Sequence, residues 1–136
     1  MSTLSLSLIA AYRATHFQVV VSPVDTITLQ VDQRSEVLAA LHHKNAVTSS
    51  AHMTAWNPLG IDTPININHA QQKKLASEMA VAGHVTLTGR GVDPEAIYRG
   101  EDHLLVLGIS RAAAIACGHR YQQNAIVWCD EQASPN

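Results

Sequence analysis

The stretch HLLVLG, His103–Gly108, decides the fold of this chain. The residues between its histidine and its glycine are all apolar, without the alternation that marks a strand with one face in water. A strand of this composition is expected where both faces of a sheet are covered. The sequence therefore predicts a sheet with packed elements on both sides.

The segments beside this strand extend the pattern in both directions. HVTLT at 84–88 is predicted as a short strand that runs into GRG at 89–91, and a polar loop is expected from 92 to 100. Ser110 is placed to cap a helix that ends near His119, and NAIVWC at 124–129 is the last strand.

The first part of the chain is predicted as a short helix, a hairpin and a second helix. The first helix is expected over Leu4–Arg13, and the hairpin strands over 16–22 and 26–31, joined by a turn at 23–25. Ser35 is placed to cap the second helix, which ends near Lys44. That helix is expected to bury its apolar residues Val37, Leu38 and Leu41.

A strand and a long helix complete the pattern. The strand is expected over Val47–Trp56, with its last four residues in the core. Pro58 should hold Asn57 in an extended conformation and lead the chain off the sheet. The helix is expected to run from an N-cap at Asn68 to Ala82, with Leu75, Met79 and Ala82 as its apolar stripe and Gly83 as its stop.

This order predicts an α+β (mixed α/β) fold with a single mixed sheet of about six strands flanked by three to four helices. The strands joined by a helix are expected to be parallel, through right-handed crossovers. No internal repeat or linker is apparent, so residues 1–136 are expected to form one domain with a frayed tail at 130–136.

Composition narrows the classes of function. The net charge is −2 and only 15% of the residues are charged, without a basic stripe, so no nucleic-acid partner is expected. No run approaches the ~20 apolar residues of a membrane helix, and the N-terminus lacks the basic start of a secretory signal. We expect a cytoplasmic protein with no membrane partner, and Cys117 and Cys129 as buried residues of a reducing compartment.

The eight histidines do not suggest a metal centre. None stands at metal-ligand spacing from another, and His42 and His43 diverge because they are adjacent on a helix. We interpret the set as scattered surface residues and expect no metal and no cofactor: His16, His42, His43, His52, His69, His84, His103 and His119. The chain also lacks a GxSxG nucleophile motif, and GRG lacks the context of a phosphate-binding loop.

Chain direction suggests one candidate site. If the strands before TAWNP and GRG are parallel and the next strand returns, the ends of four strands meet at one edge of the sheet, where ligands of open α/β sheets bind. The polar residues expected at that edge are Asn57, Asn68, Arg90, Glu101, Gln123 and Asn124. Four carboxamides, a guanidinium and a carboxylate suit recognition by hydrogen bonds better than acid–base chemistry.

Each of these residues also has a purely structural interpretation. Asn57 can form an Asx turn, Asn68 can cap a helix, and Gln123 with Asn124 can connect a loop to a strand. Arg90 and Glu101 can be a surface ion pair that contributes little. GRG can be a flexible turn, or a backbone that a ligand approaches closely.

Four stretches in this order and spacing resemble a bacterial family of unknown function, domain of unknown function 3293: AYRATHF, TAWNP, LLVLGIS and QNAIVW. The resemblance runs from about 8 to 128 and implies a small stand-alone bacterial protein without implying an activity. The family pattern falls on Tyr12, Thr15, Thr54, Trp56, Asn57, Pro58, Gly108, Gln123, Asn124 and Trp128, with Asn68 and Glu101 as further matches. The chain departs from it at Tyr121 and Gln122, where members usually have Phe-Gly, and in the loop LGIDTPINI.

Three functions remain open. The first is binding of a small polar molecule by the carboxamide-rich edge. The second is an enzyme for a nucleotide-like or amide substrate, with Glu101 as base and Arg90 holding an anionic group. The third is a protein-interaction module of an inhibitor or immunity type, which requires an exposed apolar patch at Leu59, Ile61, Ile65 and Ile67.

Overall fold

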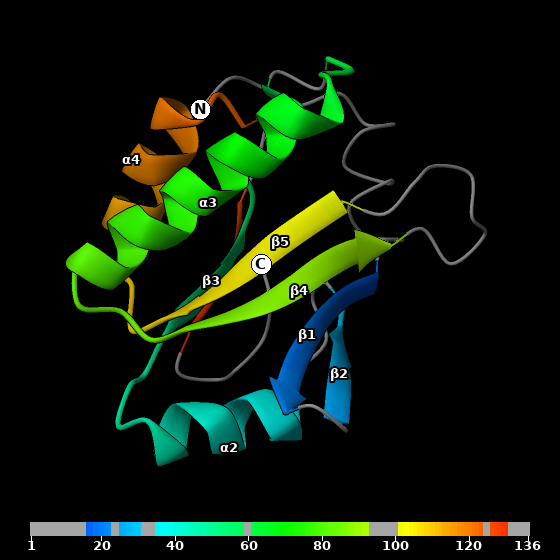
Figure 1. Ribbon diagram of the computed structural model, residues 1–136. Helices are drawn as coiled ribbons and strands as arrows, with labels where there is room; N and C mark the ends of the chain where they lie inside the picture. The colour runs from blue at the N-terminus through cyan, green and yellow to red at the C-terminus, as the bar shows by residue number, and fades with distance from the viewer. Residues whose placement is uncertain are drawn as a thin grey trace, which may run out of the picture.

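The apolar stretch at 103–108 lies in the interior of a six-stranded sheet, as strand β5 (Glu101–Leu107). The computed structural model describes residues 16–22, 25–30, 35–58, 61–92, 101–123 and 126–130 (Figure 1). The strand order is β2-β1-β4-β5-β3-β6. The other strands are β1 (His16–Ser22), β2 (Asp25–Leu29), β3 (Ser50–Met53), β4 (Thr86–Val92) and β6 (Val127–Cys129).

All neighbouring strands in this sheet are antiparallel, which corrects the expectation of a mixed sheet. The two strands joined by α3, β3 and β4, do run in the same direction, and so do the two joined by α4, β5 and β6. The members of each pair are not neighbours, because a strand of the other pair lies between them. β5 lies between β3 and β4, and β3 lies between β5 and β6. This is the split βαβ arrangement. We call β3–α3–β4–β5–α4–β6 the βαββαβ unit.

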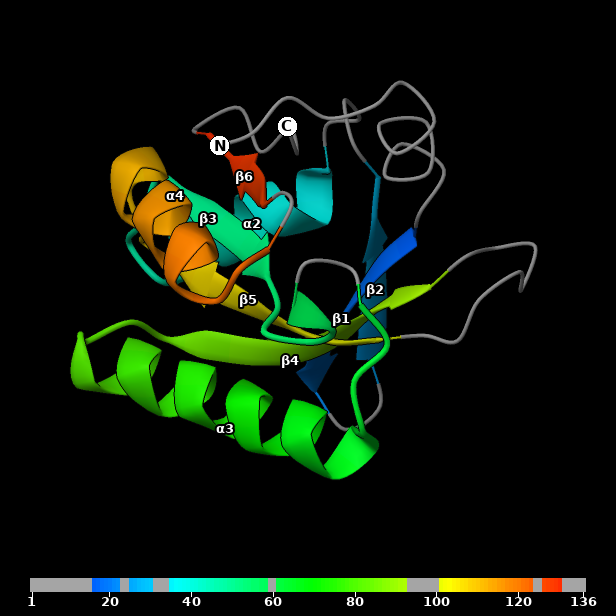
Figure 2. The same cartoon turned by 90° about the horizontal axis from the view of Figure 1, so that it is seen from above.

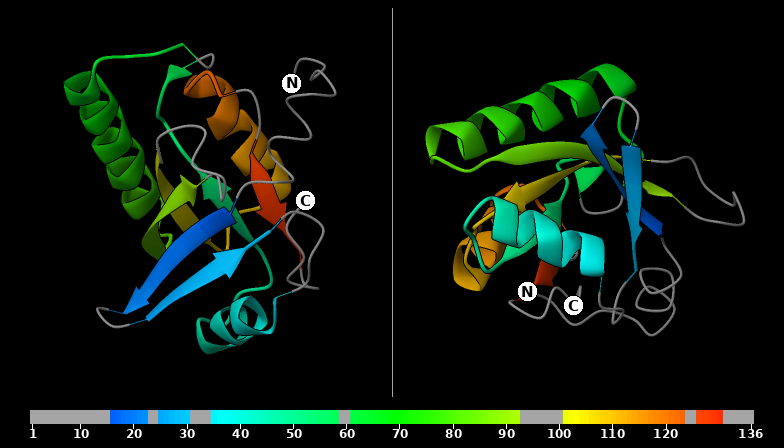
Figure 3. Two further views of the ribbon diagram at one scale, coloured as in Figure 1. Left: turned by 90° about the vertical axis from the view of Figure 1, so that its right-hand side faces the viewer. Right: turned by 90° about the horizontal axis from the view of Figure 1, so that it is seen from below.

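Three helices among the described residues cover the two faces of the sheet: α2 (Glu36–Lys44), α3 (Ile65–Val81) and α4 (Arg111–Arg120). Side chains alternate along β5, so Leu104 and Val106 pack with α3 and α4, whereas Leu105 and Leu107 pack with α2. Seen from below in Figure 3, α2 and α3 lie on opposite sides of the sheet. Both faces are therefore covered, as the composition of this strand predicted.

The hairpin β1–β2 extends the sheet beyond β4 and belongs with α2. Phe17 and Val19 of β1 share a hydrophobic cluster with Leu38 and Leu41 of α2. In Figure 2 the hairpin crosses the direction of β5 steeply, so the sheet is strongly curled at this end. We call β1, β2 and α2 the N-terminal layer.

The helix caps agree only partly with the sequence analysis. Ser35 accepts a hydrogen bond from the Leu38 amide, and Ser110 accepts one from the Ala113 amide, both at 3.1 Å. The long helix, however, begins at Ile65 after Pro64, with no side-chain cap, so Asn68 is not its N-cap. Proline takes this place because its fixed φ suits the start of a helix.

Two predicted core residues are exposed. Val37 is 49% exposed, because α2 turns only its Leu38–Leu41 side towards the sheet. Ala82 is exposed as the C-cap of α3, while Leu75 and Met79 are buried as predicted. Gly83 ends α3 with φ +88°, in the left-handed region that glycine adopts without strain.

The segment GRG lies inside β4 and is not a turn. A Cβ on Gly89 would overlap the backbone oxygen of Gln18, and one on Gly91 would lie 2.5 Å from Cε1 of His103. Glycine is therefore required here for the close approach of β1 and of a histidine ring. The expected helix 4–13, the polar loop 93–100, Leu59, Asn124 and the tail 131–136 lie outside the described residues.

The α+β class and the single six-stranded sheet are confirmed. Strand β1 has the expected bounds, whereas β3 and β6 are shorter than expected. Among the helices that the structure describes, none is both long enough and apolar enough to cross a membrane.

Candidate functional site

The TAWNP segment leaves β3 at the edge of the sheet where β4 ends and β5 begins. Asn57 and Asn68 meet there. The Asn57 amide donates to Oδ1 of Asn68 at 2.9 Å, and Nδ2 of Asn68 donates to Oδ1 of Asn57 at 2.8 Å. The same Oδ1 accepts from the Thr63 amide at 3.1 Å. The two asparagines therefore fix the loop between β3 and α3 from both ends.

Asn57 adopts φ +45°, which corrects the expectation that Pro58 would hold it extended. Asparagine tolerates the left-handed region, and its side-chain oxygen accepts two hydrogen bonds in this conformation. Asn68 is 2% exposed, and its Nδ2 also donates to the Thr63 carbonyl at 3.2 Å. Its amide thus bonds within the chain.

Thr54 and Gln72 make a second junction beside the asparagines. The Thr54 hydroxyl donates to the Asp102 carbonyl at 2.7 Å and accepts from the Trp56 amide at 3.0 Å. Oε1 of Gln72 accepts from the Ala55 amide at 2.9 Å. These contacts connect the end of β3 to both α3 and β5.

Gln123 adds a third contact to the same segment. Its Nε2 donates to the backbone oxygens of Trp56 and Tyr121, each at 3.2 Å. The carboxamides at this edge therefore hold the chain together wherever the structure describes them. Asn124 lies outside the described residues.

Arg90 and Glu101 lie on opposite faces of the sheet. In the β4–β5 register Arg90 is paired with Asp102, whereas Glu101 is paired with Gly91. Paired residues share a face and neighbouring residues alternate. Glu101 is 32% exposed, with Oε2 at 3.6 Å from Nε2 of His103. The two groups that the enzymatic hypothesis requires are therefore not assembled on one face.

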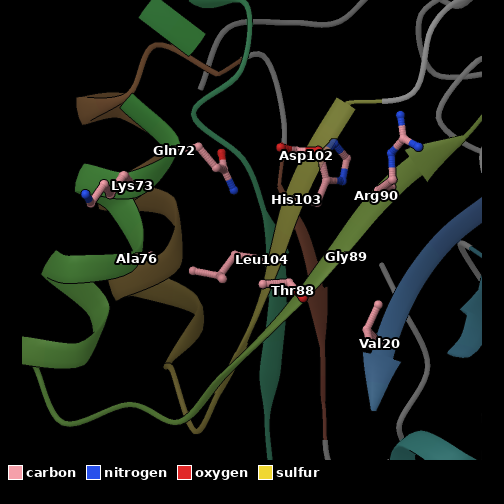
Figure 4. A pocket seen from close by; sticks show the side chains of 10 residues that line it. All are labelled: Val20, Gln72, Lys73, Ala76, Thr88, Gly89, Arg90, Asp102, His103 and Leu104. Carbon is pink, nitrogen blue, oxygen red and sulfur yellow. The ribbon is translucent and has the colours of Figure 1, made fainter. Parts of the chain in front are cut away.

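A groove of about 370 Å³ lies between α3 and the neighbouring strands. The described residues that line it are Val20, Gln72, Lys73, Ala76, Thr88, Gly89, Arg90, Asp102, His103 and Leu104. Of the six residues that the sequence analysis placed at one edge, Arg90 is among those that line this groove. The other lining residues were not predicted from the sequence. Figure 4 shows Thr88 and Leu104 low in the groove, with Gln72 and Asp102 nearer its upper end.

Gln72 has an unusual environment in this groove. Because its Oε1 accepts from the Ala55 amide, the orientation of the carboxamide is fixed and Nε2 points elsewhere. Nε2 is buried without a hydrogen-bond partner in the part of the chain that the structure describes. A buried amide donor without a partner costs about 1–3 kcal/mol. This unpartnered donor distinguishes Gln72 from the other carboxamides that the structure describes at this edge.

Asp102, which lines this groove from β5, lies close to His69 of α3. Nδ1 of His69 is 3.7 Å from Oδ2 of Asp102, with both side chains largely exposed. The His69 ring also packs edge-on against Trp56, with ring centroids 5.0 Å apart. Asp102 therefore presents a carboxylate near the Gln72 donor, on the face that carries Arg90.

Helical and strand spacing could have indicated part of this groove in the sequence. Gln72 and Ala76 are four residues apart and share a side of α3, and Thr88 shares a face of β4 with Arg90. The pairing of β4 with β1, which brings Val20 to the groove, has no such signal.

Two histidines are buried and the side chain of a third is largely covered, which corrects the expectation of surface positions. His42 is 4% exposed and its Nε2 lies 2.8 Å from the Ser50 hydroxyl. Burial lowers the pKa of His42, against a smaller opposing effect of Asp130. His52 is 3% exposed, and the side chain of His103 is 9% exposed.

His52 and His103 form a pair on the α2 face of the sheet. Their ring centroids are 4.9 Å apart, and Phe17 lies 5.0 Å from His52 and 5.9 Å from His103. All four ring nitrogens are buried without a hydrogen-bond partner among the described residues. Burial, and then the charge of His103, hold the pKa of His52 well below its usual value.

In the described part of the chain, the buried histidines and the two cysteines do not form a metal-binding site. No three His, Cys, Asp or Glu side chains there are arranged to hold an ion. Cys117 and Cys129 are buried and unbonded to each other. Burial is the main cause that raises the pKa of these thiols, to about 11 and about 12 respectively.

The fold and the groove define an α+β protein built on a split βαβ unit, with a candidate small-molecule site between α3 and the sheet. The chain belongs to the family described as protein of unknown function (DUF3293), whose model matches residues 53–126. That region runs from the last residue of β3 to the residue before β6, so it covers α3, β4, β5 and α4. Neither the curated proteins nor the solved structures contain a match.

Proposed function

We propose that this protein binds a small polar molecule in the groove between α3 and strands β4 and β5. The observation that carries the proposal is at Gln72, which lines the groove and whose buried Nε2 lacks a hydrogen-bond partner among the described residues. An oxygen acceptor of a ligand would satisfy this donor. A volume of about 370 Å³ suits a small metabolite.

The lining defines the chemistry of the ligand. Gln72 donates, and Arg90 offers a guanidinium fork, so the ligand should carry a carboxylate, phosphate or carbonyl group. Asp102 accepts, so an amine or hydroxyl should lie nearby. Ala76 and Leu104 supply an apolar surface for the rest of the molecule. A small carboxylate that also bears a hydrogen-bond donor satisfies these requirements.

Native mass spectrometry of the purified protein, followed by thermal-shift assays with small carboxylates and phosphates, tests the proposal. Thr88→Trp places a bulky ring in the groove that Thr88 lines and is expected to abolish a ligand-induced shift in Tm. Thr28→Trp is a matched control, because Thr28 is exposed and on the same side of the sheet: it pairs with Gln18, which pairs with Arg90. Equal shifts in both variants would place the ligand elsewhere and reject the groove.

A second candidate function is binding of a protein partner at the start of α3. Ile61, Ile65 and Ile67 are 62%, 60% and 46% exposed. Three large aliphatic side chains at one loop and helix end favour a protein contact. Leu59 lies outside the described residues.

Introducing a negative charge into this apolar surface tests whether it binds a protein partner. Ile65→Glu is expected to disrupt a complex with a partner, whereas Val81→Glu is expected to preserve it. Val81 is a suitable control because it is 89% exposed at the other end of the same helix. Loss of the complex in both variants would argue against a specific surface at Ile61, Ile65 and Ile67.

A further inference from the structure

The ladder between β1 and β4 is unusual because, on one face of the sheet, the residues of β4 that pair with β1 are glycines. The register pairs Phe17 with Gly91 and Val19 with Gly89. Cross-strand side-chain pairs stabilise sheets, and glycine offers no such partner. On this face Phe17 packs instead on the rings of His52 and His103, which come from the next strands of the βαββαβ unit.

The two histidine rings therefore lie in the seam between the N-terminal layer and the βαββαβ unit, beside the apolar cluster that α2 and β1 share with β5 and β6. Both rings are buried, and their four nitrogens are without hydrogen bonds in the described part of the chain. A proton on His52 would add a charge to this apolar contact. Burying an unpaired charge is far more costly than burying a neutral ring.

Few charged groups face this seam in the described residues. β1 contributes Phe17 and Val19, and β4 contributes Gly89 and Gly91 with Leu87, so neither strand adds a titratable group on this face. On β5, the Glu101 carboxylate lies 3.6 Å from Nε2 of His103. On α2, His42 bonds to Ser50 of β3 at 2.8 Å.

We infer that the His52–His103 pair is an acid-sensitive latch, which holds the N-terminal layer on the βαββαβ unit near neutral pH and releases it when His52 is protonated.

The direction of the effect follows from the state that binds the proton. In the open state His52 faces water and titrates near its ordinary pKa of about 6.5. In the closed state burial holds the pKa of His52 well below that value. The open state therefore binds more protons below pH 6.5 and becomes more populated. Between pH 7 and pH 5 its population should rise by up to about 25-fold, the limit reached when the closed state binds no proton.

Native-state hydrogen exchange of the full chain, resolved by mass spectrometry, tests the latch. After correction for the intrinsic rate at each pH, exchange in β1 and in 89–92 of β4 should be faster at pH 5 than at pH 7, by up to about 25-fold. Exchange in α3 and α4 should change less than 3-fold. Uniform acceleration over all segments would mean global unfolding and would overturn the inference.

Substitutions separate the latch from other effects of acid. His52→Phe keeps an aromatic ring but cannot bind a proton, so the acceleration in β1 should disappear. His119→Phe, at an exposed position of α4, should retain it. Persistent acceleration in His52→Phe would overturn the inference. If His52→Phe does not fold, His52→Gln answers the same question, and the segment pattern of the unmodified chain already distinguishes local from global opening.

Discussion

Asn57 and Asn68 bond to each other across the loop between β3 and α3: Nδ2 of Asn68 donates to Oδ1 of Asn57 at 2.8 Å, and the Asn57 amide donates back to Oδ1 of Asn68 at 2.9 Å. One asparagine has a positive φ and the other is 2% exposed inside the first turns of a helix. The reciprocal pair gives a structural reason for the second asparagine, eleven residues after Asn57.

Asn68→Ala is expected to destabilise the fold by about 2–3 kcal/mol, because it leaves the Asn57 amide and the Thr63 carbonyl without their partner. Urea unfolding measures the free energy. Asn66→Ala is the control, since Asn66 is exposed on the same helical turn and should change stability by less than about 0.5 kcal/mol. Equal effects of the two substitutions would contradict a role for the pair.

Gly91→Ala is expected to cost about 1–3 kcal/mol, because the new Cβ lies 2.5 Å from Cε1 of His103 and overpacks the seam. The cost should fall by at least about 1 kcal/mol in a His103→Ala background, where the ring is absent. A double-mutant cycle by chemical unfolding measures this coupling. Additive effects would show that Gly91 is required for another reason.

Tyr121 is expected to titrate at about 12 in the folded protein. Burial raises this pKa first, and the hydrogen bond from its hydroxyl to Oε1 of Glu78, at 3.1 Å, raises it further. The associated stability is complete below pH 10 and is lost as pH rises through about 12. Carbon-13 NMR of the tyrosine rings, assigned with Tyr121→Phe, measures the pKa, and Glu78→Gln should lower it.

The order of elements was predictable because it depends on local patterns. The apolar run of β5 and the serine caps at 35 and 110 have local physical causes, and the structure agrees with them. Strand pairing depends instead on contacts distant in the sequence. The interleaving of β5 between β3 and β4 therefore could not be read from the chain, nor could the inclusion of GRG in β4.

The candidate site was predictable only in part. Chain direction brings the ends of β3 and β4 and the starts of β5 and β6 to one edge, because β5 and β6 both oppose β3. Sequence could not indicate that the carboxamides Asn57, Asn68 and Gln123 bond to the chain itself. It also gave no sign that His52 and His103 would be buried, because a histidine in an alternating strand fits either face.

The two ends of the Gln72 carboxamide are expected to have separable roles. Gln72→Glu retains an oxygen for the Ala55 amide but replaces the unpartnered Nε2 with a second acceptor. It should therefore weaken binding of a carboxylate ligand at least 10-fold, and the free energy of unfolding should fall as well, because the variant buries a charged oxygen. Gln72→Leu removes the acceptor as well and should lower stability by about 1–3 kcal/mol. Isothermal titration calorimetry and urea unfolding of both variants provide the comparison. Unchanged affinity in Gln72→Glu would separate this side chain from the ligand, and equal stability in Gln72→Leu would contradict its bond to the Ala55 amide.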